Sequence, residues 1–233
     1  MEQEAAKPGQ PHCPLGLLDC PCQVTVTELR QELETLRVDA GTDRLTGLGN
    51  YRRFNEALAQ EMARTRRNGQ PMALIIADLD YFKRINDTYG HAIGNEALQH
   101  VARLWLSNSR SLDIVCRYGG EEIVFVLPDT NLPAAIHMAE RHRWLLEQTP
   151  LASSAGAIRL SASFGIAIYP AASDASPAQL IAEADHWLYQ AKANGRNRVG
   201  HPEPTEVSES TGLTRAERAA LFAPHADSRQ NDQ

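Results

Sequence analysis

The sequence predicts an α/β fold in which a central sheet is covered by helices. Residues 72–77 form a short, wholly apolar run of the kind found in buried strands. Residues 113–118 and 123–127 are two further strand-like runs around Gly119 and Gly120, and this arrangement indicates a hairpin. Elsewhere apolar residues recur every three or four positions, as on the buried face of a helix. The order of these elements favours one sheet with helical layers.

The chain is expected to contain one folded domain with flanking segments. Its 233 residues are enough for a well-buried core. Residues 1–23 are rich in Pro, Gly and Cys and read as a loop-like segment. Residues 24–41 follow as an amphipathic helix, and residues 42–201 as the main domain. Residues 202–233 turn polar and are expected to form a mostly disordered tail.

Charge and hydropathy exclude some partners. The formal net charge of −6 argues against a nucleic-acid polymer, because such binders usually carry a basic surface. No apolar run approaches the roughly 20 residues that cross a bilayer, and the N-terminus lacks the apolar core of a secretory signal. We therefore expect no membrane span and a cytoplasmic protein.

The first helix carries the spacing of a short coiled-coil seam. Its apolar positions are Val26, Leu29, Leu33, Leu36 and Ala40, with charged residues between them. A seam of two heptads is marginal by itself, so the helix either pairs with a second copy or packs on its own domain.

The remaining elements follow in order along the chain. Four helix faces are marked by Phe54, Leu58 and Met62; by Leu98, Val101 and Trp105; by Ala135, Met138, His142 and Leu145; and by Leu180, Ala184, Trp187 and Leu188. The larger apolar residues alternate strictly through residues 158–168, which predicts one strand between the last two helices.

Acidic residues stand at two points where these strands end. Asp78 and Asp80 follow the first apolar run, and Glu121 and Glu122 follow the Gly-Gly turn. Mg²⁺ takes oxygen ligands and is commonly held by one or two carboxylates, with substrate phosphates in the remaining positions. The pattern thus indicates a divalent-cation site. The alternative is an ordinary hairpin with two glutamates on its exposed side.

Five ordered motifs resemble the GGDEF family of diguanylate cyclases. They occupy residues 43–54, 78–95, 117–123, 163–166 and 189–197, and the resemblance covers roughly residues 40–200. It implies a mixed, mainly antiparallel sheet flanked by helices, similar to nucleotide cyclases and polymerase palm domains. It also implies a homodimeric enzyme that joins two GTP molecules into cyclic di-GMP, and this favours pairing of the N-terminal helix.

The resemblance also implies roles for the acidic residues. Asp78, Glu121 and the carbonyl of Leu79 would bind Mg²⁺ or Mn²⁺, and Glu121 is also the candidate general base. The role of Asp80 stays open between metal ligation and a structural role, either orienting a loop or pairing with a neighbouring cation. Glu122 matches the second acid of the signature and is expected to hold Lys83 in place.

Further matched residues would bind the nucleotide. The backbone amides of Tyr81 and Phe82 would hold phosphates while their rings pack in the core, and Gly119 and Gly120 allow close approach of the backbone. Positive charge for the triphosphate would come from Lys83, Lys192 and Arg196. The base-reading segment contains Asn86, His91 and Asn95.

Asn95 stands where the family usually has Asp. An ionised carboxylate accepts from both donors on the guanine edge, whereas Asn offers one acceptor and one donor group. We expect GTP as the main substrate with weaker discrimination, and incorporation of ATP is the alternative.

The motif Arg110-x-x-Asp113 matches the family's product-inhibition site, and Arg141 matches a second arginine of that site. Cyclic di-GMP would then be an inhibitor as well as the product. The alternative is a minor surface ion pair.

Three cysteines crowd before the first helix. Cys13, Cys20 and Cys22, with His12, are candidates for Zn²⁺ binding or for redox sensing, and an unstructured segment is the alternative. For the whole chain, an active cyclase competes with a catalytically silent receptor of cyclic di-GMP, and with a scaffold acting through the helix and tail.

Overall fold

The structure, a computed structural model, describes residues 25–26, 28–29 and 41–203. Residues 25–26 and 28–29 are helical, and the side chains of Val26 and Leu29 are exposed in the single chain. The other seam positions, Leu33, Leu36 and Ala40, lie outside the described residues. Residues 203–233 belong to a second unit, of which only Glu203 is described.

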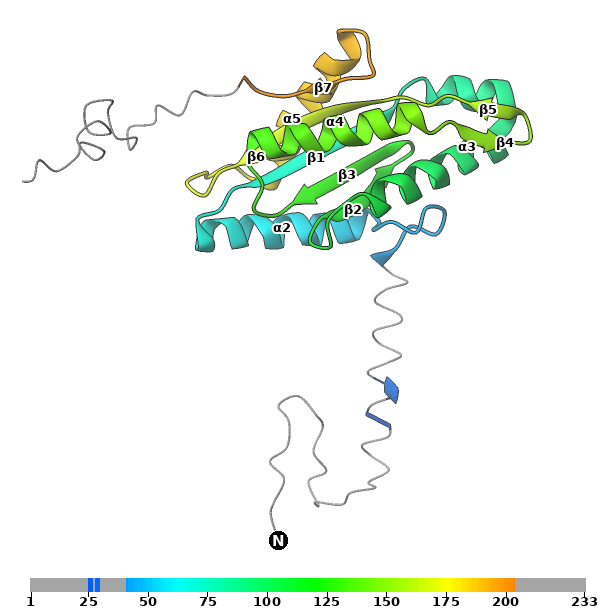
Figure 1. The fold of residues 1–233 in the computed structure, drawn as a ribbon. Coiled ribbons are helices and arrows are strands. Elements are labelled where there is room, and N and C mark those ends of the chain that lie inside the picture. The colour runs from blue at the N-terminus through cyan, green and yellow to red at the C-terminus, as the bar shows by residue number, and fades with distance from the viewer. Residues whose placement is uncertain (1–24, 27, 30–40, 204–233) are drawn as a thin grey trace, which may run out of the picture. The chain divides into compact units, whose positions relative to one another are not determined.

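One sheet with a mostly antiparallel order forms the centre of residues 41–203 (Figure 1). The elements are α2 (Tyr51–Asn68), β1 (Met72–Leu79), α3 (Phe82–Ser107), β2 (Ile114–Gly119), β3 (Glu122–Leu127), α4 (Leu132–Gln148), β4 (Leu151–Ser153), β5 (Gly156–Ile158), β6 (Ala162–Tyr169), α5 (Pro177–Ala193) and β7 (Val199–Gly200). The strand order is β2-β3-β1-β6-β7, in which only the β6 and β7 pair is parallel. This confirms the predicted fold class.

Helices cover both faces of the sheet, and β1 is therefore apolar along its whole length. Ala73, Ile75 and Ala77 pack in a core with residues of α3 and α4. The alternate residues, such as Leu74 and Ile76, pack on the opposite face with residues of α2 and α5. Because side chains alternate along a strand, Asp78 continues the second set and faces α5.

Local sequence signals set the helix ends. Asn50 caps α2 by accepting a hydrogen bond from the backbone N–H of Arg53, and the helix ends at Gly69 in the left-handed conformation. Ser176 and Gln179 form a capping box at the start of α5. Within α3, Gly90 adopts a φ of 83° and divides the element into two helical halves.

Two sequence predictions need correction. Residues 158–168 do not form one strand, because β5 ends at Ile158 and β6 begins at Ala162. The apolar alternation continues through the connection because Leu160 is itself buried. On α4, Leu146 is fully buried and Leu145 only in part, since a helix repeats its buried face at i and i+4 from His142.

Because His142 is buried, we expect the folded protein to lose stability in mild acid. Its ring is fully buried beside Trp105, and burial, aided by the charge of Arg141, lowers its pKa from 6.5 to about 4. Between these values the unfolded chain binds a proton that the folded chain does not bind. The free energy of unfolding should therefore fall by up to about 3 kcal/mol as the pH drops from about 7 to about 4. Urea unfolding across this pH range measures the loss.

The variant His142→Phe tests the origin of that loss, because phenylalanine retains an aromatic ring without a titrating group. Its stability should fall less than that of the wild type on acidification. The same exchange at His186, whose side chain is exposed, is the matched control and should leave the loss in place. An equal loss in His142→Phe and wild type would show that another group is responsible.

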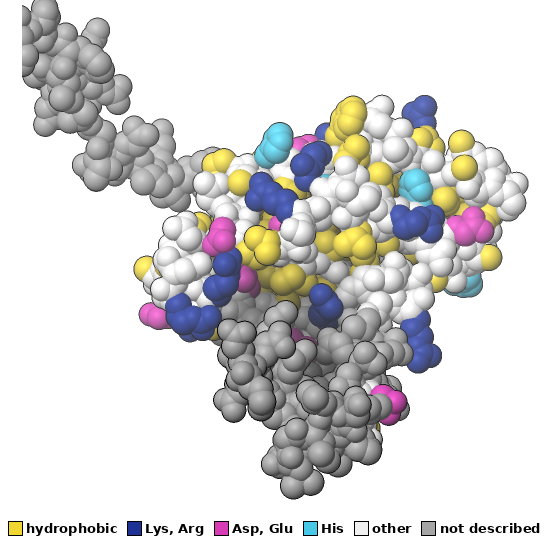
Figure 2. Space-filling model, turned by 60° about the horizontal axis from the view of Figure 1, so that its bottom comes forward, with side chains coloured by type: hydrophobic (Ala, Val, Ile, Leu, Met, Phe, Trp, Pro, Cys, Tyr) yellow, Lys and Arg dark blue, Asp and Glu magenta, His cyan; other side chains and the backbone are white. Residues whose placement is uncertain are grey.

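The surface is mixed in character. On the face that Figure 2 shows, Lys and Arg side chains lie in separate groups among hydrophobic and neutral atoms. Among the residues that the structure describes, no helix is long and apolar enough to cross a membrane.

Candidate active site

Asp78 is a buried acid at the end of β1, and it is paired with a cation. Its Oδ2 lies 2.9 Å from Nζ of Lys192, which projects from α5 on the same side of the sheet. Burial raises the pKa of Asp78 above its usual value; the pair with Lys192 opposes this rise, and the charges of Glu121 and Asp80 add to it. Asp78 therefore lies in a partly desolvated position, where a nearby cation is needed to stabilise the ionised carboxylate.

The hairpin tip that bears Glu121 is held in a defined position. Arg117 donates two hydrogen bonds to the carbonyl of Gly120, at 3.0 and 2.8 Å. The same guanidinium pairs with Asp43 at 3.3 Å. Partial burial opposes ionisation of Asp43, yet hydrogen bonds from Thr46 and the pair with Arg117 keep its pKa below the usual value. This clamp on the turn was not predicted, although Arg117 opens the signature motif.

The two signature glycines leave space at the tip. A Cβ added at Gly119 or Gly120 would meet no atom within 4 Å, and Gly120 has a φ of 50°, which favours glycine. The open space is suitable for close approach of a ligand to the backbone.

Glu122 lies beside Asp78 rather than beside Lys83. The two residues are register partners on β3 and β1. Burial raises the pKa of Glu122, the charges of Asp78 and Asp185 add to the rise, and Lys192 opposes it. Among the described residues no ion pair joins Glu122 to Lys83, so the expected contact is absent. Asp185 of α5 was not among the predicted site residues but also belongs to this cluster. Burial raises its pKa, and the charge of Lys192 opposes part of this rise.

The loop after β1 brings Tyr81 under Arg196. The Arg196 guanidinium lies 4.6 Å from the centroid of the Tyr81 ring, which is 59% exposed. The prediction that both rings pack in the core is thus wrong for Tyr81 and right for Phe82, which is buried. The reason is that Tyr81 precedes α3 in the left-handed conformation, with a φ of 57°. Lys83 is exposed on the first turn of α3.

Three predicted base-reading residues lie on α3, on the two sides of its kink. Asn86 belongs to the first half, and His91 and Asn95 are exposed on the second half. The amide of Asn86 packs so closely on Gly94 that a Cβ there would overlap its oxygen. The kink at Gly90 therefore brings Asn86 next to the turn that carries Asn95.

The predicted product-site residues line a single pocket. Arg110, Asp113 and Arg141 surround a cavity of about 200 Å³, together with His137, which the sequence analysis did not select. Asp113 accepts a hydrogen bond from the backbone N–H of Arg110 at 2.8 Å, and Arg141 donates to the carbonyl of Asn108 at 2.7 Å. These bonds fix the turn while leaving other donors of both guanidinium groups for a ligand.

The remaining site predictions concern metals. In the part of the chain that the structure describes, no three His, Cys, Asp or Glu side chains group as a metal site. Mg²⁺ does not require such a group, because one or two carboxylates with carbonyl and phosphate oxygens suffice. The residues proposed for Zn²⁺, His12, Cys13, Cys20 and Cys22, lie outside the described residues. Cys116 is buried in β2, and burial raises the pKa of its thiol to about 11.

The geometry defines a class of site. A buried acid, a second acid on a clamped glycine turn, and cationic side chains from the end of α5 lie around the end of β1. Acidic groups with adjacent cations are suited to a metal-bound polyphosphate. The fold and the site thus define an α/β domain with an acidic site flanked by cations.

Comparison with known proteins identifies the family. Residues 40–198 match the family model described as diguanylate cyclase, GGDEF domain. The response regulator PleD of Caulobacter vibrioides is 41% identical over 172 residues, which are 73% of this chain and 38% of PleD. The diguanylate cyclase DosC of Escherichia coli is 41% identical over 176 residues, 75% of this chain and 38% of DosC. The chain thus covers about two fifths of the length of these relatives.

Solved structures agree with this assignment. The coiled coil and GGDEF domain of DgcB from Caulobacter crescentus, in complex with c-di-GMP, matches with a TM-score of 0.72 and 29% identity. The match covers 78% of this chain and 95% of that chain. The active GGEEF domain of a diguanylate cyclase from Vibrio cholerae matches with a TM-score of 0.62 and 32% identity, over 67% of this chain and 98% of that one. The protein belongs to the GGDEF family.

Proposed function

We propose that this protein is a diguanylate cyclase that condenses two GTP molecules into cyclic di-GMP and two pyrophosphates. The observation that carries the proposal is the position of Asp78, Glu121 and Lys192 around the end of β1, within a domain of this family. In each of two steps, a ribose 3′-oxygen bonds to an α-phosphorus, the bond from that phosphorus to the β-phosphate oxygen breaks, and the hydroxyl loses its proton.

The donor set fits a hard divalent cation. Asp78, Glu121 and the carbonyl of Leu79 offer oxygen atoms, and the ammonium of Lys192 already pairs with Asp78. Mg²⁺ or Mn²⁺ at these oxygens would lower the pKa of the attacking hydroxyl and neutralise charge on the phosphoryl oxygens. Glu121 is the candidate acceptor of the hydroxyl proton.

Binding of the triphosphate is assigned to two neighbouring segments. The amides of Tyr81 and Phe82 face it from the start of α3, and Lys83 adds charge from the same turn. Lys192 and Arg196 approach from the end of α5, where Arg can contact two oxygens at once. Lys192 then exchanges Asp78 for a phosphate when substrate binds. Gly119 and Gly120 let the hairpin tip lie against the nucleotide.

Asn86 and Asn95 are assigned to the guanine edge. The kink of α3 places Asn86 against Gly94, the residue before Asn95, and this proximity supports the role. We expect Asn95→Asp to lower KM for GTP by about fivefold, because a neutral hydrogen bond becomes charge-assisted, a gain of about 1 kcal/mol. Steady-state kinetics with GTP, and product analysis after incubation with equal GTP and ATP, measure the effect.

Asn55→Asp is the matched control, since it adds the same charge at an exposed position of α2. Its KM for GTP should equal that of the wild type. Product that contains mainly adenine from the wild-type protein would contradict the assignment of GTP as the main substrate.

Two further parts of the proposal concern assembly and feedback. Because each active site holds one GTP, closing the cyclic product requires two domains facing each other, and we assign this to a homodimer assisted by the N-terminal helix. The pocket of Arg110, Asp113 and Arg141 is assigned to cyclic di-GMP as an inhibitor. The close grouping of two cations and one acid in a concave site supports this assignment.

A silent receptor of cyclic di-GMP is the competing function. It would use the Arg110 pocket alone, and the departure at Asn95 favours it. Incubation of the purified protein with GTP and Mg²⁺, followed by mass spectrometry of the products, distinguishes the two. Cyclic di-GMP with two pyrophosphates is the expected outcome; intact GTP together with tight binding of cyclic di-GMP would establish the receptor instead.

A further inference from the structure

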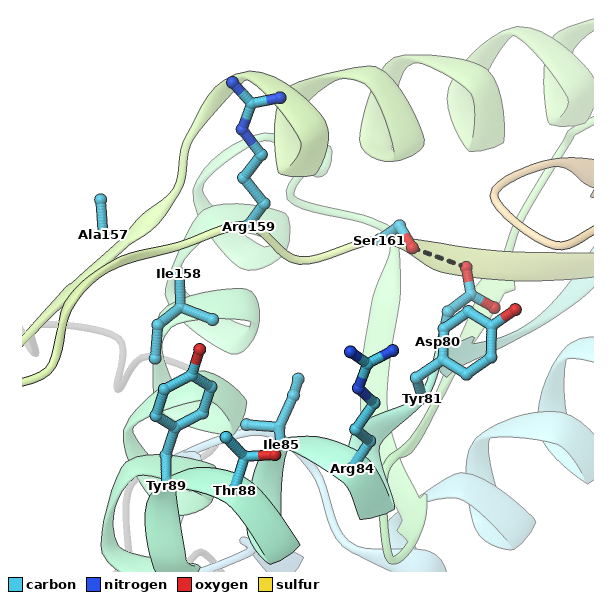
Figure 3. A pocket seen from close by; sticks show the side chains of 10 residues that line it. All are labelled: Asp80, Tyr81, Arg84, Ile85, Thr88, Tyr89, Ala157, Ile158, Arg159 and Ser161. Atoms are coloured by element: carbon cyan, nitrogen blue, oxygen red, sulfur yellow. Dashed lines mark hydrogen bonds between the residues drawn. The ribbon is translucent and has the colours of Figure 1, made fainter.

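Asp80 is a buried carboxylate whose oxygens are engaged by three donors. It is 5% exposed. Oδ1 accepts from the hydroxyl of Ser163 at 2.7 Å, and Oδ2 accepts from the hydroxyl of Ser161 at 2.9 Å. Figure 3 shows the second bond. The third donor is the backbone N–H of Asn197, 2.9 Å from Oδ2. Burial of an ion is tolerated only with such compensation.

The bond from Asn197 holds a strained stretch of backbone. Arg196 and Asn197 have φ values of 61° and 45°, in the left-handed region that side chains rarely adopt. Such residues persist where the surroundings fix them. Asp80 is one of these surroundings, because it binds the Asn197 amide directly. The Arg196 amide bonds in addition to the carbonyl of Ala191 at 3.0 Å.

The same carboxylate lies between the two segments assigned to the triphosphate. Tyr81, whose amide belongs to the first segment, is its sequence neighbour. Arg196, of the second segment, precedes the bound Asn197 and stacks on the Tyr81 ring. We name Asp80, Ser161, Ser163 and Asn197 the carboxylate clasp. The clasp joins the loop after β1 to the turn after α5.

We propose that Asp80 is a positioning residue, which through the clasp holds Arg196 at the correct separation from the Tyr81 and Phe82 amides to bind one triphosphate. The proposal rests on the proposed function of the site. It also assigns Asp80 a role other than metal ligation, since three of its roughly four acceptor positions are taken by protein donors.

Asp80→Asn is the first test, because it retains the size of the side chain but removes the negative charge that the three donors surround. The amide oxygen can still accept from the Asn197 N–H and from Ser161, and the amide NH2 can donate to Ser163, but these bonds are no longer charge-assisted. KM for GTP should rise about tenfold while kcat changes little, the signature of lost substrate binding. The half-saturating Mg²⁺ concentration should not change. A large rise in that concentration, or a fall in kcat alone, would overturn the proposal. Asp174→Asn, at an exposed position, is the matched control.

Binding measurements separate this inference from the proposed function. The affinities of an unreactive GTP analogue and of GMP are measured for wild type and Asp80→Asn without any turnover. The analogue should bind about tenfold more weakly to the variant, and GMP, which lacks the outer phosphates, should bind equally to both. Equal weakening of both ligands would show a general structural role. Absence of cyclic di-GMP synthesis in the wild type would instead contradict the proposed function.

Two further variants keep the test valid if Asp80→Asn does not fold. Ser161→Ala removes one donor and leaves the charge, and it should weaken the GTP analogue about threefold with no effect on GMP. Arg196→Ala, combined with Ser161→Ala, should weaken the analogue no more than Arg196→Ala alone, because residues acting through each other are not additive. If the fold-losses in analogue affinity of the two single variants multiplied in the double variant, the proposed role of the clasp would be refuted. The same holds if Ser161→Ala had no effect on the affinity of the analogue.

Discussion

Glu121→Gln should reduce kcat for cyclic di-GMP synthesis by about a thousandfold, because a neutral amide is a poor ligand for a hard cation and cannot accept the hydroxyl proton. The fold should be retained, since Glu121 lies in a turn whose position is fixed by Arg117 and the Gly120 carbonyl. The rate of pyrophosphate release at saturating GTP and Mg²⁺ measures the loss.

The control is Glu56→Gln, which makes the same chemical change on the exposed side of α2. It should turn over GTP at the wild-type rate. A Glu121→Gln protein that retained even a tenth of the wild-type kcat would contradict the role of this carboxylate, because a lost metal ligand costs several kcal/mol of transition-state stabilisation.

Arg110→Ala should raise the concentration of cyclic di-GMP needed for half inhibition by at least about tenfold. Bonds between a guanidinium group and a phosphate are charge-assisted, and the loss of one or two of them corresponds to about 1.5 kcal/mol or more. Initial rates at increasing added cyclic di-GMP give the inhibition curve, and each rate is normalised to the same protein without product. Arg141→Ala, on α4, should act in the same direction, because Arg141 lines the same pocket.

Arg84→Ala is the matched control, since Arg84 is an exposed arginine on α3 that lines a different pocket (Figure 3). Its inhibition curve should equal that of the wild type. If Arg110→Ala and wild type gave the same curve, the pocket beside α4 would not be the product site.

Local patterns predicted most of the fold. The apolar run at residues 72–77 lies inside β1, because a strand covered on both faces contains few polar residues. The hairpin around Gly119 and Gly120 was predicted to within one residue at each strand. The division of residues 158–168 between β5 and β6 was not predicted. Leu160 lies in the connection but is buried, so the alternation of apolar residues continues between the two strands.

The site was predicted less completely, because local patterns contain no information on distant partners. The acids at the end of β1 and at the hairpin tip follow from strand order, and they lie near enough for the charge of Glu121 to raise the pKa of Asp78. The pair between Lys192 and Asp78 requires the register of α5 on the sheet. The partners of Asp80 likewise come from β6 and the turn after α5, which no sequence spacing predicts.

The central claim is that the carboxylates of Asp78 and Glu121 bind one divalent cation together with a nucleoside triphosphate. A crystal structure of the protein with Mn²⁺ and an unreactive GTP analogue tests it most directly, because anomalous scattering locates the ion. We predict an ion within about 2.2 Å of an oxygen from each carboxylate and in contact with the phosphates. Nucleotide bound at this site with the ion held by only one carboxylate, or by neither, would contradict the claim.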